Sequence, residues 1–316
     1  MDFNFNKNTK IYVAGHKGLI GSSFIRYFRN NNYRNIVYRN RNELDLTSKK
    51  DTLDFFNEVK PEVVILSAGK VGGIIQNRDF PADFIFENIS IQSNVIGAAY
   101  ESGVKKLIFF ASSCMYPKVT QQPMKESQLF TGHLEQSSIA YAIAKYAGLE
   151  MCKSINQQNG IVSCIPVIPN STYGPNDNFE LKSSHVLSAL IRRIHEAKVQ
   201  NKANLILWGS GKPKREFIYV DDVTKACMKI LGSDLSNDLL PINIGVGDDI
   251  SIRLLANKIC EIVGYSGEIE WDTSKPDGAS RKILDSTRVR EMDWMPIISL
   301  DEGLKLTYEW YLDSVK

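Results

Sequence analysis

The chain has 316 residues, of which 43% are hydrophobic and 23% are charged, and its net charge is +2. This composition is typical of a globular protein with a sizeable core. The near-neutral charge argues against a nucleic-acid binder. The apolar runs have the length of strands, so no membrane span is expected. Five scattered cysteines without a C-x-x-C pair, and no signal-peptide pattern, indicate reduced thiols and a cytoplasmic location. No metal site is predicted.

A glycine-rich turn follows the first apolar run, residues 10–14, and precedes a helical pattern. The turn reads Gly15-His16-Lys17-Gly18-Leu19-Ile20-Gly21. Gly15 permits a tight turn, Gly18 lets the backbone approach a pyrophosphate, and Gly21 allows the helix to pack on the strand. Free N–H groups at the start of the helix then face the phosphates. The G-x-x-G-x-x-G spacing is similar to that of short-chain dehydrogenases, so the turn is predicted to bind a dinucleotide.

The second predicted strand is followed by Arg39-Asn40-Arg41. An NAD site usually places an acidic residue here to hold the ribose 2′-hydroxyl. Arg41, together with Lys17, favours a 2′-phosphate instead, so NADP(H) is the predicted cofactor. Glu43 leaves NAD as an alternative. Asp45 and Leu46 are expected along the adenine edge.

Strand and helix patterns alternate through the first half of the chain. Continuously apolar strands are predicted at 62–66, 106–110 and from Val162 to Val167, and helices at 51–59 and 81–102. Buried strands joined by helices indicate a doubly wound parallel sheet, an α/β fold of the Rossmann type.

The chain is expected to leave this sheet through an irregular loop at 169–175. Residues 1–168, with returning segments at about 216–248, are predicted to form the nucleotide-binding domain. Residues 169–215 and 249–316 are predicted to form a smaller mixed α/β lobe that binds the substrate.

A candidate reductive site lies between residues 111 and 145. Tyr141 and Lys145 are four residues apart in a predicted helix, so they share one face. A lysine ammonium near a phenol favours the phenolate, which eases proton transfer near neutral pH. Ser112, at the end of a buried strand, is placed to hydrogen-bond the same substrate oxygen. With a hydride donor beside it, this set can reduce or oxidise a C–O bond.

Several longer motifs carry a resemblance to a known family. They are Ala14-Gly-His-Lys-Gly, Ala68-Gly-Lys-Val-Gly-Gly, Ser112-Ser-Cys-Met-Tyr-Pro, Tyr141-Ala-Ile-Ala-Lys, Trp208-Gly-Ser-Gly-Lys-Pro-Lys-Arg-Glu-Phe and Ser274-Lys-Pro-Asp-Gly with Arg281-Lys282. Together they resemble the GDP-L-fucose synthase family of extended short-chain dehydrogenases/reductases over essentially the whole chain. The resemblance implies conversion of GDP-4-keto-6-deoxy-D-mannose to GDP-L-fucose, by epimerisation at C3 and C5 and NADPH-dependent reduction at C4.

The resemblance also implies roles for individual residues. Ser112, Tyr141 and Lys145 match the reductive triad, and Cys114 and His185 match the acid/base pair for epimerisation. The implied cofactor-binding residues are Gly15, His16, Lys17, Gly18, Leu19, Ile20, Gly21, Arg41, Asp45, Leu46, Tyr141, Lys145, Pro169, Ser171, Thr172 and His185. The implied GDP-sugar residues are Arg193, Trp208, Arg215, Asp277 and Lys282. Related enzymes are commonly homodimers that pack through two long helices, here 81–102 and 138–158.

Neighbouring reactions leave two alternatives. Nucleotide-sugar dehydratases typically carry Thr-Asp-Glu where this chain has Ser112-Ser113-Cys114, so dehydration is not expected. The family usually reads Pro-Thr-Asn-Leu-Tyr-Gly-Pro where this chain has Pro169-Asn-Ser-Thr-Tyr-Gly-Pro, beside the sugar. A C4 reductase of a related GDP-4-keto hexose or heptose, without epimerisation, is therefore the main alternative. A non-catalytic NADP sensor is the second, although such proteins commonly lack the Tyr or the Lys.

Overall fold

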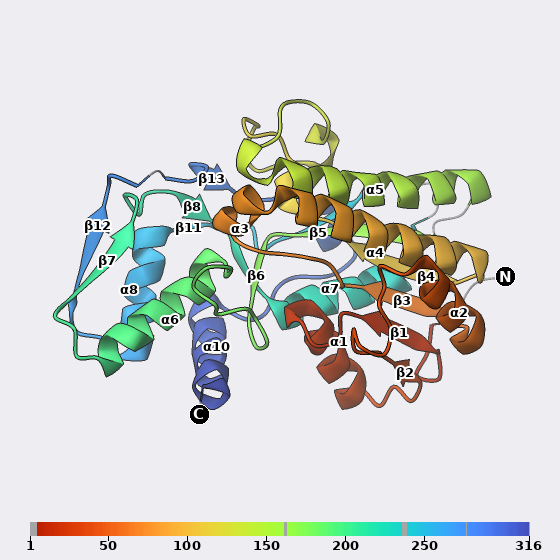
Figure 1. Ribbon diagram of the computed structural model, residues 1–316, viewed down its shortest axis with the longest axis horizontal. Coiled ribbons are helices and arrows are strands. Elements are labelled where there is room, and N and C mark those ends of the chain that lie inside the picture. Colours follow the sequence, from red (N-terminus) through yellow and green to blue (C-terminus); the bar gives the residue numbers. More distant parts are fainter. Residues whose placement is uncertain (1–4, 161–162, 236–238, 276, 316) are drawn as a thin grey trace.

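A six-stranded parallel sheet lies at the centre of the computed structural model, which describes residues 5–160, 163–235, 239–275 and 277–315 (Figure 1). In spatial order its strands are β10 (Ile242–Ile244), β5 (Cys164–Pro169), β4 (Lys106–Phe110), β3 (Val63–Leu66), β1 (Ile11–Ala14) and β2 (Ile36–Val37). Every neighbouring pair is parallel. The Rossmann-type sheet is thus confirmed. The strand expected from Val162 begins at Cys164, and Val162 lies outside the described residues.

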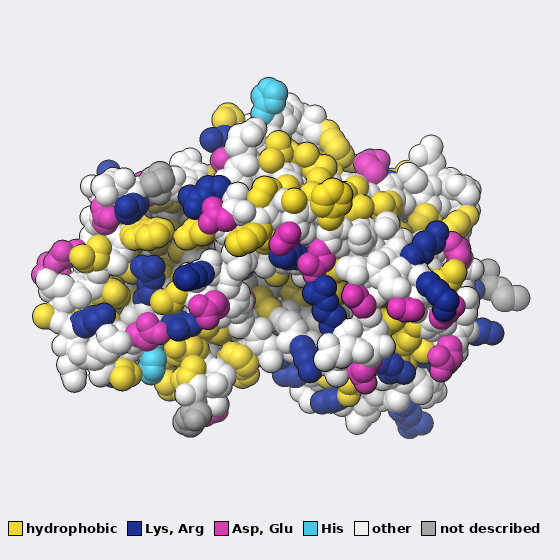
Figure 2. Space-filling view, in the orientation of Figure 1, with side chains coloured by type: hydrophobic (Ala, Val, Ile, Leu, Met, Phe, Trp, Pro, Cys, Tyr) yellow, Lys and Arg dark blue, Asp and Glu magenta, His cyan; other side chains and the backbone are white. Residues whose placement is uncertain are grey.

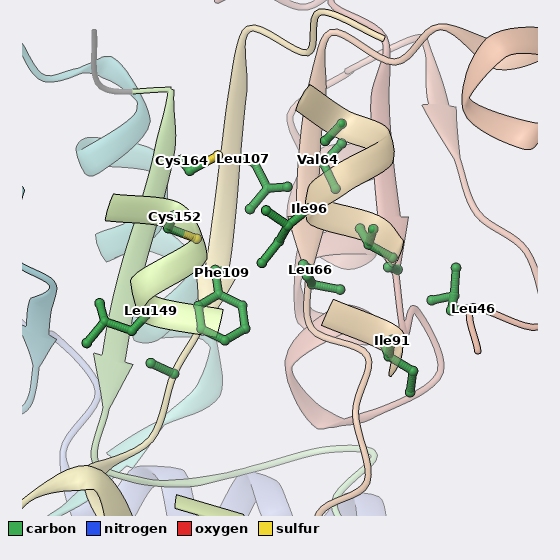
Figure 3. Packing of buried hydrophobic residues seen from close by; sticks show 14 of the residues in the cluster. Leu46, Val64, Leu66, Ile91, Ile96, Leu107, Phe109, Leu149, Cys152 and Cys164 are labelled. Atoms are coloured by element: carbon green, nitrogen blue, oxygen red, sulfur yellow. The ribbon is translucent and has the colours of Figure 1, made fainter. Parts of the chain in front are cut away.

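Successive residues of each buried strand contact opposite helical layers, because side chains alternate across a strand. Val64 and Leu66 pack with α2 (Lys49–Val59), α4 (Pro81–Glu101) and α5 (Ile139–Asn159). Figure 3 shows this layer around Leu66 and Phe109. Val63 and Ile65 pack with α1 (Leu19–Asn30) and α7 (Val220–Gly232) on the other face. The sheet therefore has a hydrophobic core on each side.

A third hydrophobic core lies in the other half of the molecule (Figure 1). It packs α6 (Val186–Val199), α8 (Ile252–Val263) and α10 (Leu300–Ser314) with the parallel pair β7 (Asn204–Trp208) and β12 (Glu268–Asp272). The remaining helices are the short α3 (Ile74–Asp79) and α9 (Thr287–Arg290), and single 3-10 turns occupy Ser113–Met115, Glu126–Gln128 and Gln136–Ser138.

Very short strands connect the two halves. β8 (Lys214–Arg215) pairs with β11 (Ile250–Ser251) and β13 (Arg281–Lys282), and β6 (Ser171–Tyr173) pairs with β9 (Phe217–Tyr219). β6 corrects the expectation of an irregular loop at 169–175. Its ladder partner lies far along the sequence, so the local turn residues gave no sign of it.

Among the residues that the structure describes, no helix combines the length and apolar character needed to cross a bilayer. Within the same ranges, His, Cys, Asp and Glu side chains form no group of three or more suited to a metal ion.

Candidate active site

Lys145 and Tyr141 lie side by side on α5, at the carboxyl end of β4. The Lys145 side chain is buried, and its Nζ donates a hydrogen bond to the Phe110 carbonyl oxygen at 2.8 Å. The same Nζ lies 5.8 Å from the centroid of the Tyr141 ring. The i, i+4 spacing places both residues on one face of the helix, and the last residue of β4 anchors the ammonium there.

Burial dominates the ionisation of both groups. It strongly raises the pKa of Tyr141, the nearby Cys114 raises it further, and a hydrogen bond with the Ser112 side chain lowers it. Burial lowers the pKa of Lys145 from 10.5 to about 8. Burial is the largest influence on the Tyr141 pKa, and the Lys145 ammonium bonds to the Phe110 carbonyl oxygen. A protonated phenol suits reduction, in which it donates its proton to the new alkoxide.

Cys114 belongs to the same cluster. It lies in the 3-10 turn Ser113–Met115, and its backbone N–H donates to Ser112 Oγ at 3.2 Å. The thiol is free and half-buried, and Ser112 Oγ, which accepts from the Cys114 N–H, also hydrogen-bonds with Tyr141. Ser112, Cys114, Tyr141 and Lys145 thus meet at one edge of the sheet.

Asn88 and Gly69 bring α4 to this cluster. The buried Asn88 accepts from the Lys70 backbone N–H at 3.0 Å and donates to the Lys70 carbonyl at 2.9 Å. A Cβ on Gly69 would lie 2.7 Å from Asn88 Oδ1 and 3.8 Å from Lys145 Nζ. A side chain is therefore excluded at Gly69, and the loop after β3 stays close to the lysine.

The glycine turn after β1 has the properties that a dinucleotide site needs. Gly15 has φ +84°, and a Cβ there would lie 2.7 Å from the Ala68 backbone nitrogen. A Cβ on Gly21 would lie 2.2 Å from the Gly15 carbonyl oxygen, whereas Gly18 has room. Gly18 immediately precedes α1 and offers no side-chain cap, so the first N–H groups of the helix are available to an anion.

The other predicted cofactor residues surround this turn. The His16 ring stacks on Tyr38 with centroids 4.6 Å apart, and Lys17 is exposed next to it, while Leu19 and Ile20 form the first turn of α1. Arg41 is exposed and forms an ion pair with Glu87 of α4 at 3.0 Å. Asp45 accepts two hydrogen bonds from Thr47, which lower its pKa, and Leu46 is buried.

A polar network that sequence reasoning missed joins the two halves beside Pro169, Ser171 and Thr172. The fully buried Glu216 accepts from the side-chain amide of Asn170. It also accepts from the backbone N–H groups of Gly247 at 2.6 Å and Leu284 at 2.9 Å. Burial raises the pKa of Glu216, and these hydrogen bonds lower it. Only the position of Glu216 next to the apolar run 217–220 signals its burial in the sequence.

His185 is exposed and is the residue that precedes α6. Two residues earlier, the Ser183 carbonyl accepts from the Gly73 backbone N–H at 2.9 Å, which anchors this segment near the loop after β3. Among the described residues no hydrogen bond or ion pair joins His185 to Cys114.

The predicted GDP-sugar residues lie at the ends of the short strands. The exposed Trp208 ring is 5.6 Å from the Arg193 guanidinium and 5.9 Å from Lys275 Nζ. Asp277 accepts from the Ser210 backbone N–H at 2.8 Å. Arg215 donates to the Ala279 carbonyl at 2.6 Å, and Lys282 pairs with Arg215 in register. Figure 2 shows the surface hollowed between the two halves. The structure therefore gathers these residues around two loops, 208–213 and 272–280.

Comparison with known proteins agrees with this arrangement. The profile of the NAD dependent epimerase/dehydratase family matches residues 11–245. The chain belongs to this family. It is 48% identical over 310 residues to GDP-L-fucose synthase 1 of Arabidopsis thaliana, covering 98% of this chain and 95% of that one. It is 44% identical over 314 residues to GDP-L-fucose synthase of Escherichia coli K12, covering 96% and 97%. The expected resemblance to this group is thus confirmed.

Solved structures extend the likeness to a second activity. A GDP-mannoheptose C4 reductase from Campylobacter jejuni, solved with NADP bound, superposes with a TM-score of 0.88. It is 36% identical and covers 98% of this chain and 100% of that one. Reductases of GDP-heptoses are therefore structural neighbours of this member of the epimerase/dehydratase family.

Proposed function

We propose that this enzyme converts GDP-4-keto-6-deoxy-D-mannose to GDP-L-fucose with NADPH as the reductant. Full-length identity of 44–48% to GDP-L-fucose synthases supports this activity. The observation that carries it at the level of the site is the cluster of Ser112, Tyr141 and Lys145 with Cys114 beside them. A reductase alone has no need of that thiol.

NADP(H) is the cofactor, and it supplies the hydride for C4. The glycine turn fits its pyrophosphate, because α1 begins without a side-chain cap and Gly18 carries no side chain at the helix start. Lys17 and Arg41 are the cations for the 2′-phosphate. Arg41 pairs with Glu87, so the phosphate competes with that carboxylate for the guanidinium.

Epimerisation precedes reduction in this proposal. The protons on C3 and C5 are acidic only because they flank the C4 ketone, whose oxygen gains charge as an enolate forms. Ser112 and Tyr141 donate hydrogen bonds to that oxygen. Cys114 removes a proton as the thiolate, and His185 returns one from the other face. Tyr141 then protonates the C4 oxygen during reduction, while Lys145 stabilises the resulting phenolate.

Isotope exchange tests the whole proposal. The protein is incubated with GDP-4-keto-6-deoxymannose in D₂O, first alone and then with NADPH, and the products are followed by NMR. Deuterium at C3 and C5, followed by GDP-L-fucose, is the expected outcome. Reduction without exchange would refute the epimerase half, and no turnover would refute the assignment.

Reduction of a related GDP-4-keto hexose or heptose without epimerisation is the second candidate. It is favoured by the 36% identity to the heptose C4 reductase and by the departure at Asn170, Ser171 and Thr172. In that case Cys114→Ser leaves turnover of the enzyme's own substrate unchanged. A marked loss of turnover in Cys114→Ser, with C4 chemistry intact, supports the synthase instead.

We infer a division of labour between the two halves. The sheet, residues 1–168 with about 216–248, holds NADP(H), and the remainder holds the GDP-sugar. Arg193, Trp208, Arg215, Asp277 and Lys282 are the substrate-binding set, and the cations among them suit the diphosphate. Isothermal titration of GDP with Arg215→Ala checks this, since GDP affinity falls while NADP affinity stays the same.

We also infer a homodimer in the cytoplasm. Apolar residues are exposed along the two long helices, Phe86 and Tyr100 on α4 and Ile143 on α5, and Figure 2 shows apolar side chains gathered over this region. A second copy that packs there would cover them. The five free thiols suit a reducing compartment. Light scattering on Phe86→Glu, with the wild type as control, should show conversion of dimer to monomer.

A further inference from the structure

Arg41, the cation proposed for the 2′-phosphate, is held by a carboxylate from a distant part of the chain. Its Nη1 lies 3.0 Å from Glu87 Oε1 on α4, and within the described ranges this is its one ion pair. The Arg41 side chain is 68% exposed, whereas that of Glu87 is 23% exposed. Glu43, the acidic residue nearest in the sequence, instead accepts from the Asn40 backbone N–H at 2.6 Å. The carboxylate that faces the guanidinium is therefore Glu87.

Glu87 also has a second cation close to it. Lys70 Nζ lies 3.7 Å from Glu87 Oε2 and donates to Asp83 Oδ2 at 3.0 Å. Asp83 and Glu87 are four residues apart on α4, so their carboxylates lie on one face of the helix. Each carboxylate oxygen of Glu87 thus faces a different cation. If Arg41 turns away, Glu87 still has Lys70 as a counter-ion.

We propose that Glu87 is a specificity-determining residue, which sets how strongly the protein prefers NADP(H) to NAD(H). Before the cofactor binds, its carboxylate neutralises Arg41, so a ribose 2′-phosphate has to displace that carboxylate from the guanidinium. Arginine binds phosphate through strong charge-assisted hydrogen bonds, whereas an exposed ion pair is weak, so the phosphate prevails. Lys70 then compensates the charge of Glu87. A dinucleotide with a 2′-hydroxyl leaves the Arg41–Glu87 pair intact.

This inference rests on the proposed role of Arg41, and binding measurements test it without any turnover. Isothermal titration with NADP⁺ and with NAD⁺ gives the preference for the 2′-phosphate directly. Glu87→Gln keeps the size of the side chain but releases Arg41, so it should tighten NADP⁺ binding about 3- to 10-fold. NAD⁺ affinity should change less than about twofold. Unchanged NADP⁺ affinity would reject the role of Glu87 and leave that of Arg41 standing.

Asp83→Asn is the matched control for charge. It removes one carboxylate from the same face of α4, and the closer partner of Lys70, but leaves the Arg41–Glu87 pair in place. NADP⁺ affinity should stay within about twofold of the wild type. A gain equal to that of Glu87→Gln would mean that only the overall charge of the helix matters, and it would overturn the proposal.

A double-mutant cycle asks whether Glu87 acts through Arg41. In the Arg41→Ala background, Glu87→Gln should no longer tighten NADP⁺ binding, because the guanidinium to be released is gone. A full gain in that background would overturn the proposal. Weaker NADP⁺ binding in Glu87→Gln alone would overturn it too, since the carboxylate would then orient Arg41 toward the phosphate. If Arg41→Ala itself leaves NADP⁺ affinity unchanged, the role of Arg41 fails first and this inference with it.

Lys70→Met tests the exchange of partners. Without this ammonium, Glu87 loses its second cation and should hold Arg41 more tightly, so NADP⁺ affinity should fall about 2- to 5-fold. The loss should disappear in the Glu87→Gln background, where no carboxylate competes for the guanidinium. A loss that persists there would show that Lys70 does not act through Glu87, and it would overturn the exchange.

Discussion

The two halves of the molecule hold their candidate functional residues in opposite ways. Lys145 is 5% exposed, and its ammonium bonds to the end of a strand in the continuous parallel sheet. Trp208 is 55% exposed at the end of a two-stranded ladder, with Arg193 and Lys275 over its ring. One region is packed from both sides, and the other presents its side chains to solvent.

This difference suits two tasks. A buried polar group has to keep its partners, because leaving them unpaired costs free energy, so the geometry around Lys145 is rigid. Exposed aromatic and cationic side chains change rotamer at little cost and can close over a ligand. The sheet edge therefore suits bond-making chemistry, and the second half suits recognition.

The largest expected effect is at the edge of the sheet, where Tyr141 lies beside the buried Lys145. Tyr141→Phe removes the proton donor and should lower the rate of C4 reduction by about 100- to 10,000-fold. Substrate affinity should change little, because the ring itself remains. Stopped-flow measurement of NADPH oxidation checks the rate, and circular dichroism checks folding. A variant within about tenfold of wild type would contradict the role of this phenol.

The burial of Lys145 predicts a dependence of stability on pH. Its pKa is lowered from 10.5 to about 8 in the folded state. Below about pH 8 Lys145 is protonated in both the folded and the unfolded chain. The cost of burying its ammonium then lowers the free energy of unfolding by its full amount. Between about pH 8 and 10.5 only the unfolded chain binds the proton, so the free energy of unfolding rises with pH.

Relative to Lys145→Met, the wild type should gain up to about 3 kcal/mol across this window. Urea unfolding of both proteins at several pH values from 7 to 10.5 measures the difference. A constant difference would show that the lysine titrates at its ordinary pKa in the folded protein.

Glu216 lies between the two halves of the molecule, so its replacement measures how much this carboxylate stabilises their junction. Glu216→Gln weakens the acceptor for three donors at once and should lower the free energy of unfolding by about 1–3 kcal/mol. Guanidinium unfolding measures the loss. Glu261→Gln, at an exposed position of α8, is the control and should stay within about 0.5 kcal/mol of wild type. Equal stability of the two variants would mean that the junction does not depend on this carboxylate.

The smallest effect is expected in the exposed half. Trp208→Ala removes the ring between Arg193 and Lys275 and should raise KM for the GDP-sugar by about 5- to 30-fold, with kcat nearly unchanged. Ile206→Ala is a matched control, because Ile206 is as exposed, at 57%, and lies two residues earlier on β7. A fall in kcat for Trp208→Ala would mean that this residue also affects the chemical step. It would then weaken the contrast between a half that carries out chemistry and a half that recognises the substrate.

Local patterns predicted the elements of the sheet half well. The strand at Lys106–Phe110 has the expected bounds, the helix expected at 81–102 is found at Pro81–Glu101, and the glycine turn has the tight conformation that its spacing indicates. These features depend on neighbours a few residues away, which is why periodicity and turn residues reveal them. The pairing of Tyr141 with Lys145 on one helix face is local in the same sense.

By itself, the sequence determined the fold class, the dinucleotide turn and the family resemblance, because each depends on short motifs in order along the chain. Only the tertiary structure decided that β6 pairs with β9, that Glu216 accepts a hydrogen bond from Asn170, and that Asp177 accepts one from α6. It also decided that burial raises the pKa of Tyr141. Burial and contacts between distant segments set these properties, and a single sequence does not record which segments meet.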